Sequence, residues 1–276
     1  MTNGHDGFPN DYLDHVPNLK LISSNGVGYD AFDTDEAVRR NILVPHTPNV
    51  LNAETSTTAL LLYLACYRDF VHCEAYARNG NRATDGPSKL TRTADGRKVG
   101  ILGMGRIGLA IAKKLEAFGC SIVYHTRTPK EDVSYRHYSD LVAMAKDVEC
   151  LVCIVPGGPA TKHMVNESVL TALGFDGVLI NVSRGSVVDE QALIEALVNG
   201  HLGWAGLDVF ENEPTIPANL RALRNVVLLP HVGSATVETR AAMGDLTVDN
   251  ILRHIQDGTV VSPVPECGHL CIGASG

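Results

Sequence analysis

The stretch that decides the fold of this chain reads Lys98-Val99-Gly100-Ile101-Leu102-Gly103-Met104-Gly105-Arg106-Ile107-Gly108. It joins an apolar strand to a turn with G-x-G-x-x-G spacing, and a helical pattern follows the turn. A second short strand, residues 121–124, comes about 20 residues after the first glycine. This context indicates a dinucleotide-binding βαβ unit. A glycine-rich turn that binds nothing is the weaker alternative.

Each glycine of this turn has its own physical reason. Gly103 permits the tight turn, Gly105 lets a pyrophosphate approach the backbone, and Gly108 allows close packing of helix on strand. The phosphates are then expected at the helix N-terminus, where backbone N–H groups lack partners within the helix. Gly103, Gly105 and Gly108 are therefore candidate cofactor-binding residues.

The end of the second strand indicates which dinucleotide is bound. A carboxylate at this position would bind the ribose hydroxyls of NAD and repel a 2′-phosphate. The chain has no acid here and carries Thr126, Arg127 and Thr128 after His125. An arginine flanked by hydroxyls suits a phosphate dianion, so we expect NADP(H) to be preferred over NAD(H). The alternative is a solvated loop arginine.

The composition is that of an ordinary globular protein. The chain has 276 residues, 45% of them hydrophobic and 20% charged, with a formal net charge of −8. This charge argues against nucleic acid and anionic membranes as partners. No segment approaches the ~20 apolar residues of a membrane span, and the N-terminus has no signal-peptide pattern. We expect a cytoplasmic protein.

The seven cysteines are scattered and lie mostly in apolar runs, as reduced thiols do. Cys150 and Cys153 have C-x-x-C spacing but fall in a strand-like run, where residues three apart point to opposite faces. Cys267 and Cys271 in the tail, with His269 between them, form a slightly better metal candidate. A disordered tail is the favoured interpretation there. We expect no metal site.

Strand-like and helix-like runs alternate along the chain, which predicts an α/β fold with a parallel sheet covered on both faces. An apolar helical pattern over residues 50–77 is expected in the core or at a dimer interface, and residues 79–97 are expected to form a loop or arm. An early strand, residues 18–24, ends in two glycines whose backbone N–H groups could face an anion; a plain strand-to-helix turn is the equal alternative. The remaining predicted strands are residues 43–45, 150–155, 178–182, 205–209 and 226–229, and the remaining helices are residues 33–39, 140–145, 166–172, 190–198 and 236–256.

Three residues with usable chemistry follow three successive strand ends: Arg184, Glu213 and His231. Ligands of open parallel sheets bind outside the carboxyl ends of the strands, so these side chains can converge where a nicotinamide would lie. Taken singly, each could be a surface ion-pair partner, a solvated turn residue or a histidine satisfied at a strand end. Together with a dinucleotide site they fit a hydride-transfer centre.

The reduction of a 2-keto acid assigns a role to each of them. Histidine suits protonation of the developing alkoxide near neutral pH. A carboxylate beside the imidazole, Glu213, would fix its tautomer and favour the protonated ring. Arg184 supplies a planar, permanent charge for the substrate carboxylate and the polarised carbonyl.

Several motifs, in order, resemble those of the D-isomer-specific 2-hydroxyacid dehydrogenase family across nearly the whole chain. The matching stretches are Asn25-Gly26-Val27-Gly28-Tyr29-Asp30, residues 103–108, Asn181-Val182-Ser183-Arg184-Gly185, Gly206-Leu207-Asp208-Val209-Phe210, Glu213-Pro214 and Pro230-His231-Val232-Gly233-Ser234-Ala235-Thr236. Within the family, residues 124–128 and 156–161 look most similar to NADPH-preferring glyoxylate/hydroxypyruvate reductases. Glu213 argues against the formate dehydrogenase branch, which lacks this glutamate.

The resemblance implies a Rossmann-type doubly wound sheet with a smaller flavodoxin-like substrate domain, and a homodimer built through the cofactor domain. It implies Arg184, Glu213 and His231 as the catalytic set, and the amides of Val27 and Gly28 on the substrate carboxylate. It places Asp208 on the nicotinamide carboxamide. Further implied cofactor contacts are Arg106, Ile107, Pro156, Val182 and Gly233.

The chain departs from the family pattern at its start. Family members usually carry roughly fifty more residues before this point, consistent with a complete two-domain size. We therefore expect an incomplete, N-terminally truncated substrate domain made of residues 1–52 and 238–276, and a dinucleotide-binding domain of residues 53–237. An inner strand would be left as an edge. Thr57 replaces an acidic residue of the family.

Two hypotheses of different classes follow. The first is an NADPH-dependent reductase of glyoxylate, hydroxypyruvate or a similar 2-keto acid. The second is a catalytically impaired or silent dinucleotide-binding protein, either truncated or acting as a cofactor-sensing interaction module. The intact catalytic residues favour the enzyme, and the missing first units favour the silent protein.

Overall fold

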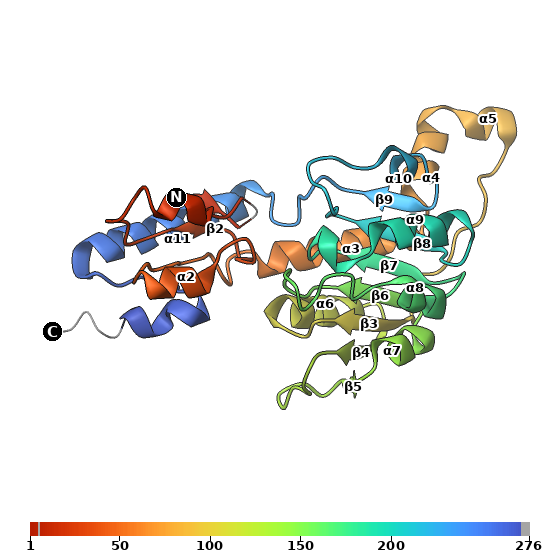
Figure 1. The fold of residues 1–276 in the computed structure, drawn as a ribbon. Helices are drawn as coiled ribbons and strands as arrows, with labels where there is room; N and C mark the ends of the chain where they lie inside the picture. Colours follow the sequence, from red (N-terminus) through yellow and green to blue (C-terminus); the bar gives the residue numbers. More distant parts are fainter. Residues whose placement is uncertain (5, 272–276) are drawn as a thin grey trace. The chain divides into compact units, whose positions relative to one another are not determined.

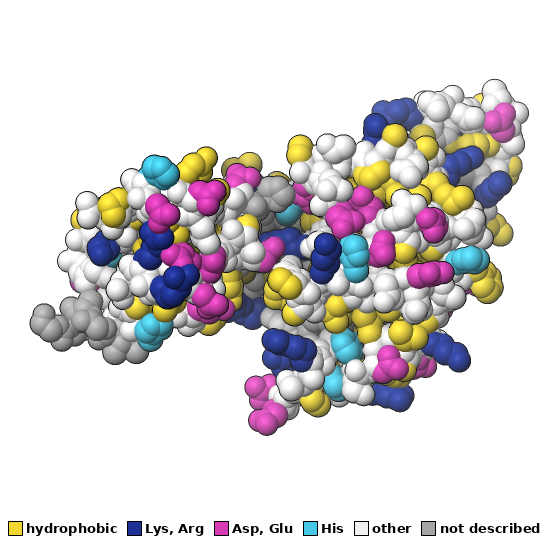
Figure 2. Space-filling view, viewed as in Figure 1, with side chains coloured by type: hydrophobic (Ala, Val, Ile, Leu, Met, Phe, Trp, Pro, Cys, Tyr) yellow, Lys and Arg dark blue, Asp and Glu magenta, His cyan; other side chains and the backbone are white. Residues whose placement is uncertain are grey.

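The computed structural model describes residues 1–4 and 6–271. The chain divides into two compact units, a smaller one of Met1–Glu54 with Ser234–Gly276 and a larger one of Thr55–Gly233. Each unit has its own cluster or clusters of buried apolar side chains. Acidic and basic side chains are interspersed on the face shown in Figure 2.

The larger unit contains a seven-stranded sheet in which every pair of neighbours is parallel. The strand order is β5-β4-β3-β6-β7-β8-β9 (Figure 1). The chain runs outward from β3 in one direction and then from β6 in the other, so the order reverses between β3 and β6. Such a reversal marks the dinucleotide crevice of a doubly wound sheet. The strands are β3 Lys98–Leu102, β4 Ser121–His125, β5 Arg136–Tyr138, β6 Cys150–Cys153, β7 Val178–Asn181, β8 Trp204–Leu207 and β9 Val226–Leu228.

Successive residues of the inner strands face two separate cores. Ile101 lies in the core that helices α3 and α6 cover, whereas Leu102 lies in the core that α7, α8 and α9 cover. Both side chains are fully buried, and each contributes about 1.5–3 kcal/mol by leaving water. The covering helices are α3 Asn52–Tyr67, α6 Arg106–Glu116, α7 Leu141–Asp147, α8 Glu167–Leu173 and α9 Glu190–Val198. The prediction of a parallel sheet covered on both faces is confirmed.

The prediction of one helix over residues 50–77 is wrong. The chain breaks at Asp69, which has a left-handed φ of 47°, and continues as α4, Phe70–Arg78. Helix α3 buries eight residues and α4 buries none, because the apolar face ends with the sheet it covers. The expected loop after it holds a short helix, α5 (Asn81–Asp85), and both α4 and α5 project from the sheet (Figure 1).

Smaller corrections concern weak local signals. Strand β5 was not expected, because it is short and only half-buried. The predicted strand over residues 18–24 is reduced to a single bridge between Leu21 and Leu43, followed by β2 (Ser24–Asn25). In the larger unit a 3₁₀ turn, η1 (Gly185–Val187), follows β7, and helix α10 (Ala218–Arg221) precedes β9.

The smaller unit is built on a two-stranded parallel sheet, in which β1 (Thr2–Asn3) pairs with β2. Its helices are α1 Asn10–Leu13, α2 Thr34–Arg39, α11 Val237–Asp257 and the 3₁₀ turn η2 Pro265–Cys271. Thr236 caps α11 by accepting a hydrogen bond from the Thr239 amide. The prediction of a disordered tail is wrong as far as Cys271, because Cys267 is buried in this unit's core; residues 272–276 lie outside the described residues.

Two absences hold for the part of the chain that the structure describes. No group of three or more His, Cys, Asp or Glu side chains there is arranged to hold a metal ion. No helix there combines the length and hydropathy needed to cross a membrane.

Candidate active site

The centre of the candidate site is a pair formed by His231, after β9, and Glu213, after β8. The Nδ1 atom of His231 lies 2.7 Å from the Oε2 atom of Glu213. The other carboxylate oxygen of Glu213 accepts a hydrogen bond of 3.0 Å from the Phe210 amide. The Glu213 side chain is 15% exposed and that of His231 is 42% exposed. The Phe210 amide thus holds the Glu213 carboxylate in place, while the His231 imidazole stays accessible to solvent.

Asp208 anchors the segment that carries His231. Its two carboxylate oxygens accept hydrogen bonds from the amides of Val232 (2.7 Å) and Gly233 (2.8 Å). The side chain is only 2% exposed, and this burial raises the pKa of the Asp208 carboxyl, although the two amide bonds and the charge of His231 oppose the rise. The resemblance implied only a nicotinamide contact for Asp208. The structure adds a second task for it, the placement of the backbone next to His231.

Arg184 follows β7 and begins the turn η1. The segment is shaped by Asn181, whose Oδ1 accepts from the Ser183 amide and whose Nδ2 donates to the Arg184 carbonyl. The guanidinium donates to the Ser183 carbonyl at 2.9 Å. A Cβ atom at Gly185 would lie 1.9 Å from the carbonyl of Phe210. Only glycine allows this approach, which packs the Arg184 segment against the segment of Glu213.

The glycine-rich turn has the geometry that a pyrophosphate requires. Gly103 has a φ of 102°, and a Cβ atom at Gly108 would lie 2.1 Å from the Gly103 carbonyl oxygen. Around Gly105, by contrast, no atom lies within 4 Å of the Cβ position. Gly105 caps α6 without a side-chain hydrogen bond, so the amides of Arg106 and Ile107 begin the helix beside open space. These residues fit a dinucleotide phosphate.

The end of β4 presents an accessible cation. Arg127 is exposed, and within the described residues its guanidinium has no hydrogen bond or ion pair. Next to it, the Thr126 hydroxyl donates to the Thr128 carbonyl at 2.7 Å. The His137 ring, on β5, contacts the Thr126 carbonyl at 2.9 Å and stacks on His125 at an interplanar angle of 11°. Sequence reasoning missed His137 because it missed β5.

The other expected cofactor residues lie at the carboxyl ends of neighbouring strands. Pro156 follows β6, and its carbonyl accepts from the Thr161 hydroxyl at 2.7 Å. Val182 follows β7 directly and is buried. Gly233 closes the segment that Asp208 holds.

The expected substrate-binding residues Val27 and Gly28 belong to the smaller unit. The Val27 carbonyl lies 2.9 Å from His46 Nδ1, and the Gly26 carbonyl accepts from the Thr47 amide at 2.8 Å. His46 is 7% exposed. It was missed in the sequence because nothing local marks a histidine that supports a loop nineteen positions away.

Comparison with known proteins gives consistent matches. The model of the D-isomer specific 2-hydroxyacid dehydrogenase NAD-binding domain matches residues 60–233. Glyoxylate/hydroxypyruvate reductase A of Arabidopsis thaliana is 46% identical over 264 residues, covering 96% of this chain and 84% of that protein. A 2-ketogluconate reductase of Gluconobacter oxydans is 42% identical, covering 95% of this chain and 84% of that protein.

Solved structures agree with these matches. The NADPH-dependent glyoxylate/hydroxypyruvate reductase of Sinorhizobium meliloti, crystallised with NADP and malonate, superimposes with a TM-score of 0.92 at 48% identity. The match covers 96% of this chain and 83% of that structure.

Proposed function

This chain belongs to the D-isomer specific 2-hydroxyacid dehydrogenase family, and we propose that it reduces a small 2-keto acid with NADPH to the D-2-hydroxy acid. Glyoxylate and hydroxypyruvate are the proposed substrates, because the relatives named above include reductases of these two acids. The observation that carries the proposal is the contact of 2.7 Å between His231 and Glu213. The pair stands at the carboxyl edge of the same sheet as the glycine-rich turn.

The residues divide the work of such a reduction. NADPH, when bound, supplies the hydride. Since the Nδ1 atom of His231 faces Glu213, the protonated ring carries its transferable proton on Nε2 and gives it to the developing alkoxide of the substrate. Glu213 sets the orientation of the His231 ring. Arg184 binds the substrate carboxylate, and the amides of Val27 and Gly28 are proposed, from the family resemblance, to assist it.

The cofactor contacts are proposed in the same way. The Arg106 and Ile107 amides at the open start of α6 suit the pyrophosphate. Arg127, with the hydroxyls of Thr126 and Thr128, suits the 2′-phosphate of NADPH. The nicotinamide end is assigned to Pro156, Val182, Asp208 and Gly233.

The direct test measures NADPH absorbance while the purified chain is given glyoxylate, hydroxypyruvate or pyruvate in turn. We expect turnover, fastest with glyoxylate or hydroxypyruvate. A protein that binds NADPH, as seen by fluorescence or calorimetry, but turns over none of the three acids would be the silent dinucleotide-binding protein instead. The family match and the paired His231 and Glu213 favour the enzyme.

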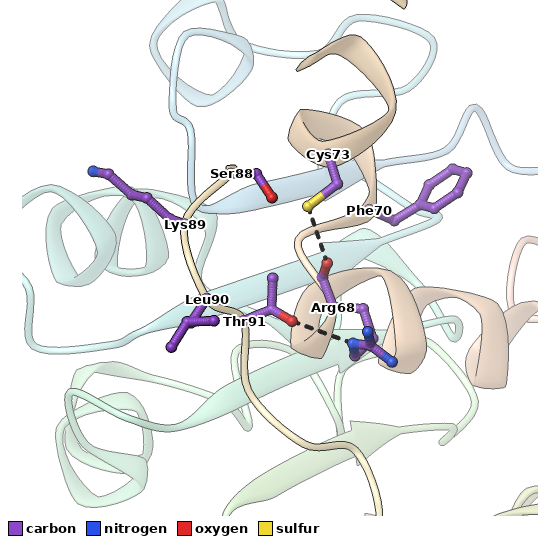
Figure 3. Close-up of a pocket in the computed structure, with 7 residues that line it drawn as sticks. All are labelled: Arg68, Phe70, Cys73, Ser88, Lys89, Leu90 and Thr91. Atoms are coloured by element: carbon purple, nitrogen blue, oxygen red, sulfur yellow. Dashed lines mark hydrogen bonds between the residues drawn. The ribbon is translucent and has the colours of Figure 1, made fainter. Parts of the chain in front are cut away.

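We also propose that the chain forms a homodimer through the larger unit. Phe70 is 57% exposed and Leu90 is 99% exposed, and both line a groove on the projecting segment (Figure 3). The other groove residues are Arg68, Cys73, Ser88, Lys89 and Thr91. The dimer is proposed from the family resemblance, and these two exposed side chains mark where on the larger unit we expect it to form.

The oligomeric state tests the dimer. Light scattering after size-exclusion chromatography should give twice the monomer mass for the wild type and the monomer mass for F70S/L90S. A monomeric wild type would contradict the dimer.

We propose that the protein works in a reducing compartment such as the cytoplasm. Its seven cysteines are all free, as is usual for proteins of such compartments.

A further inference from the structure

A second histidine–glutamate pair adjoins the proposed catalytic pair along the chain. His163 Nε2 lies 2.7 Å from Glu211 Oε1, and Glu211 stands two positions before Glu213. His163 has a left-handed φ of 52°, as His231 has one of 55°. A non-glycine residue in this region is strained and persists only where its surroundings fix it. The surroundings of His163 therefore hold it where its ring contacts Glu211.

Glu211 is held by two neighbouring segments at once. Its side chain meets His163 in the segment after β6, and its amide donates to Glu190 Oε2 at 3.3 Å in the segment after β7. His163 itself is fixed to that second segment, because its amide donates to the Ser186 carbonyl at 2.8 Å. Three successive loops of the sheet thus meet at Glu211.

The charges around this junction make the histidine necessary. Asp189 Oδ2 lies 3.9 Å from His163 Nδ1, so His163 faces Asp189 and Glu211. Burial raises the pKa of the Glu190 carboxyl; the hydrogen bond from the Glu211 amide opposes this rise, and the charge of Glu211 adds to it. Without a donor at position 163, the carboxylate of Glu211 would face these acidic neighbours unpaired and would turn towards solvent.

Glu211 and Glu213 are close in the same turn, so a movement of Glu211 also displaces Glu213. Phe210 is buried, packs against Gly185, and donates its amide to Glu213 Oε1. Glu211 is the next residue and Glu213 lies two residues further on, so the turn is fixed at Phe210 and Glu211 before it presents the Glu213 carboxylate. A loosened Glu211 would weaken the placement of that carboxylate against His231.

We propose that His163 and Glu211 are positioning residues, which clamp the turn after β8 so that Glu213 meets the Nδ1 atom of His231. The consequence for turnover rests on the proposed function. The clamp itself is a property of the free protein and can be tested without a substrate.

The test compares E211A, E211Q and H163N by the ¹⁵N signals of the neutral His231 ring, assigned as those missing from a H231N variant. In the wild type the contact with Glu213 should place the proton on Nδ1. We expect E211A and H163N to shift His231 towards the Nε2–H form that a free histidine prefers. E211Q keeps an acceptor for His163 and should resemble the wild type. Asparagine tolerates a positive φ, so H163N should fold.

Kinetics give the second readout. E211A and H163N should lose about 10- to 100-fold in kcat, the effect of a small misplacement, with the KM for NADPH unchanged. H201N serves as the matched control, because His201 is exposed and lies before β8, at the far end of the sheet.

Unchanged His231 signals in E211A would overturn the clamp. Equal effects of E211A and E211Q would also overturn it, because they would show that the charge of Glu211 matters rather than its contact. If H163N does not fold, the comparison of E211A with E211Q decides whether the clamp exists. If the wild type turns over no keto acid, the proposed function fails, and the ring signals still decide whether the clamp exists.

Discussion

His231 Nδ1 lies 2.7 Å from Glu213 Oε2, although the two residues follow different strands and stand eighteen positions apart. The contact depends on two anchors. Asp208 holds the backbone next to His231, and the Phe210 amide holds the carboxylate of Glu213. The proposed proton donor and the residue that orients it are therefore placed by hydrogen bonds to the backbone.

Replacement of His231 should abolish turnover without affecting cofactor binding. We expect H231Q to lose about 100- to 10,000-fold in kcat, the usual contribution of a general acid. NADPH binding, measured by fluorescence, should match the wild type, since the turn at Gly105 is untouched. H201Q is the control. Full activity of H231Q would remove His231 from its role.

Replacement of Glu213 by glutamine should slow the reaction without weakening cofactor binding. The Glu213 carboxylate orients the His231 ring through its contact of 2.7 Å with Nδ1. We therefore expect E213Q to lose about 10- to 100-fold in kcat, the effect of a small misplacement of a reacting group, with the KM for NADPH unchanged. E195Q, a change at an exposed glutamate of α9, should match the wild type. An unchanged kcat in E213Q would contradict the role of Glu213.

Reversal of the charge at Arg127 should change the cofactor preference. A charge-assisted hydrogen bond is worth about 1.5–3 kcal/mol, so R127D should lower kcat/KM for NADPH by about 10- to 100-fold. NADH has no 2′-phosphate and should be used as well as before or better. K130D makes the same change of charge three residues further along the chain. It shows whether the effect of R127D comes from a direct contact with the phosphate or from the general loss of positive charge. The phosphate assignment fails if the NADPH-to-NADH ratio of R127D equals that of the wild type.

Two glycines of the turn should respond differently to alanine. A Cβ atom at Gly105 meets no atom within 4 Å, whereas one at Gly108 lies 2.1 Å from the Gly103 carbonyl oxygen. G105A should therefore melt with the wild type but bind NADPH more weakly, because the methyl group occupies the space of the pyrophosphate. G108A should be destabilised by about 1–3 kcal/mol. Thermal melts and NADPH titrations measure both effects, and tight NADPH binding by G105A would place the pyrophosphate elsewhere.

Glu149 should stabilise the sheet in a pH-dependent manner. Burial acts to raise the pKa of its carboxyl, but hydrogen bonds from the Lys98 amide and the Arg97 guanidinium outweigh burial and hold the pKa below its ordinary value. A lowered pKa gives stability that is present above the ordinary pKa of glutamate, about 4.3, and is lost as the pH falls below it.

The comparison of E149Q with the wild type by urea denaturation tests this sign. At pH 7 the variant should be less stable, by no more than about 1 kcal/mol because the side chain is nearly half exposed. The difference should shrink as the pH falls towards 4 and below. A difference that grows on acidification would show that the sign is wrong.

Local patterns were enough to predict most of the sheet. The apolar runs that became β3, β6, β7, β8 and β9 are buried on both faces, so they carry a strong signal along the chain. The glycine spacing at residues 103–108 marks a turn whose steric demands are local. Weak signals failed: β5 is half-buried, and the break at Asp69 depends on where the sheet ends rather than on the helix sequence.

The candidate site could be predicted only in part, because some of its residues carry a local signal and others do not. Arg184, Glu213 and His231 could be named because each stands just after a strand, and parallel strands bring their carboxyl ends to one edge. His163, Glu211 and His137 could not be named. Their partners lie on other loops or strands, and no spacing along the chain records such contacts.

By itself, the sequence determined the parallel sheet covered on both faces, the glycine-rich turn and the edge where the polar residues gather, because these follow from apolar periodicity and from the steric needs of glycine. Only the tertiary structure decided that His231 meets Glu213, that Asp208 holds two backbone amides, and that Gly185 brings two loops into contact. Hydrogen bonds between loops form at distances of about 3 Å. Such distances are set by the packing of the whole unit.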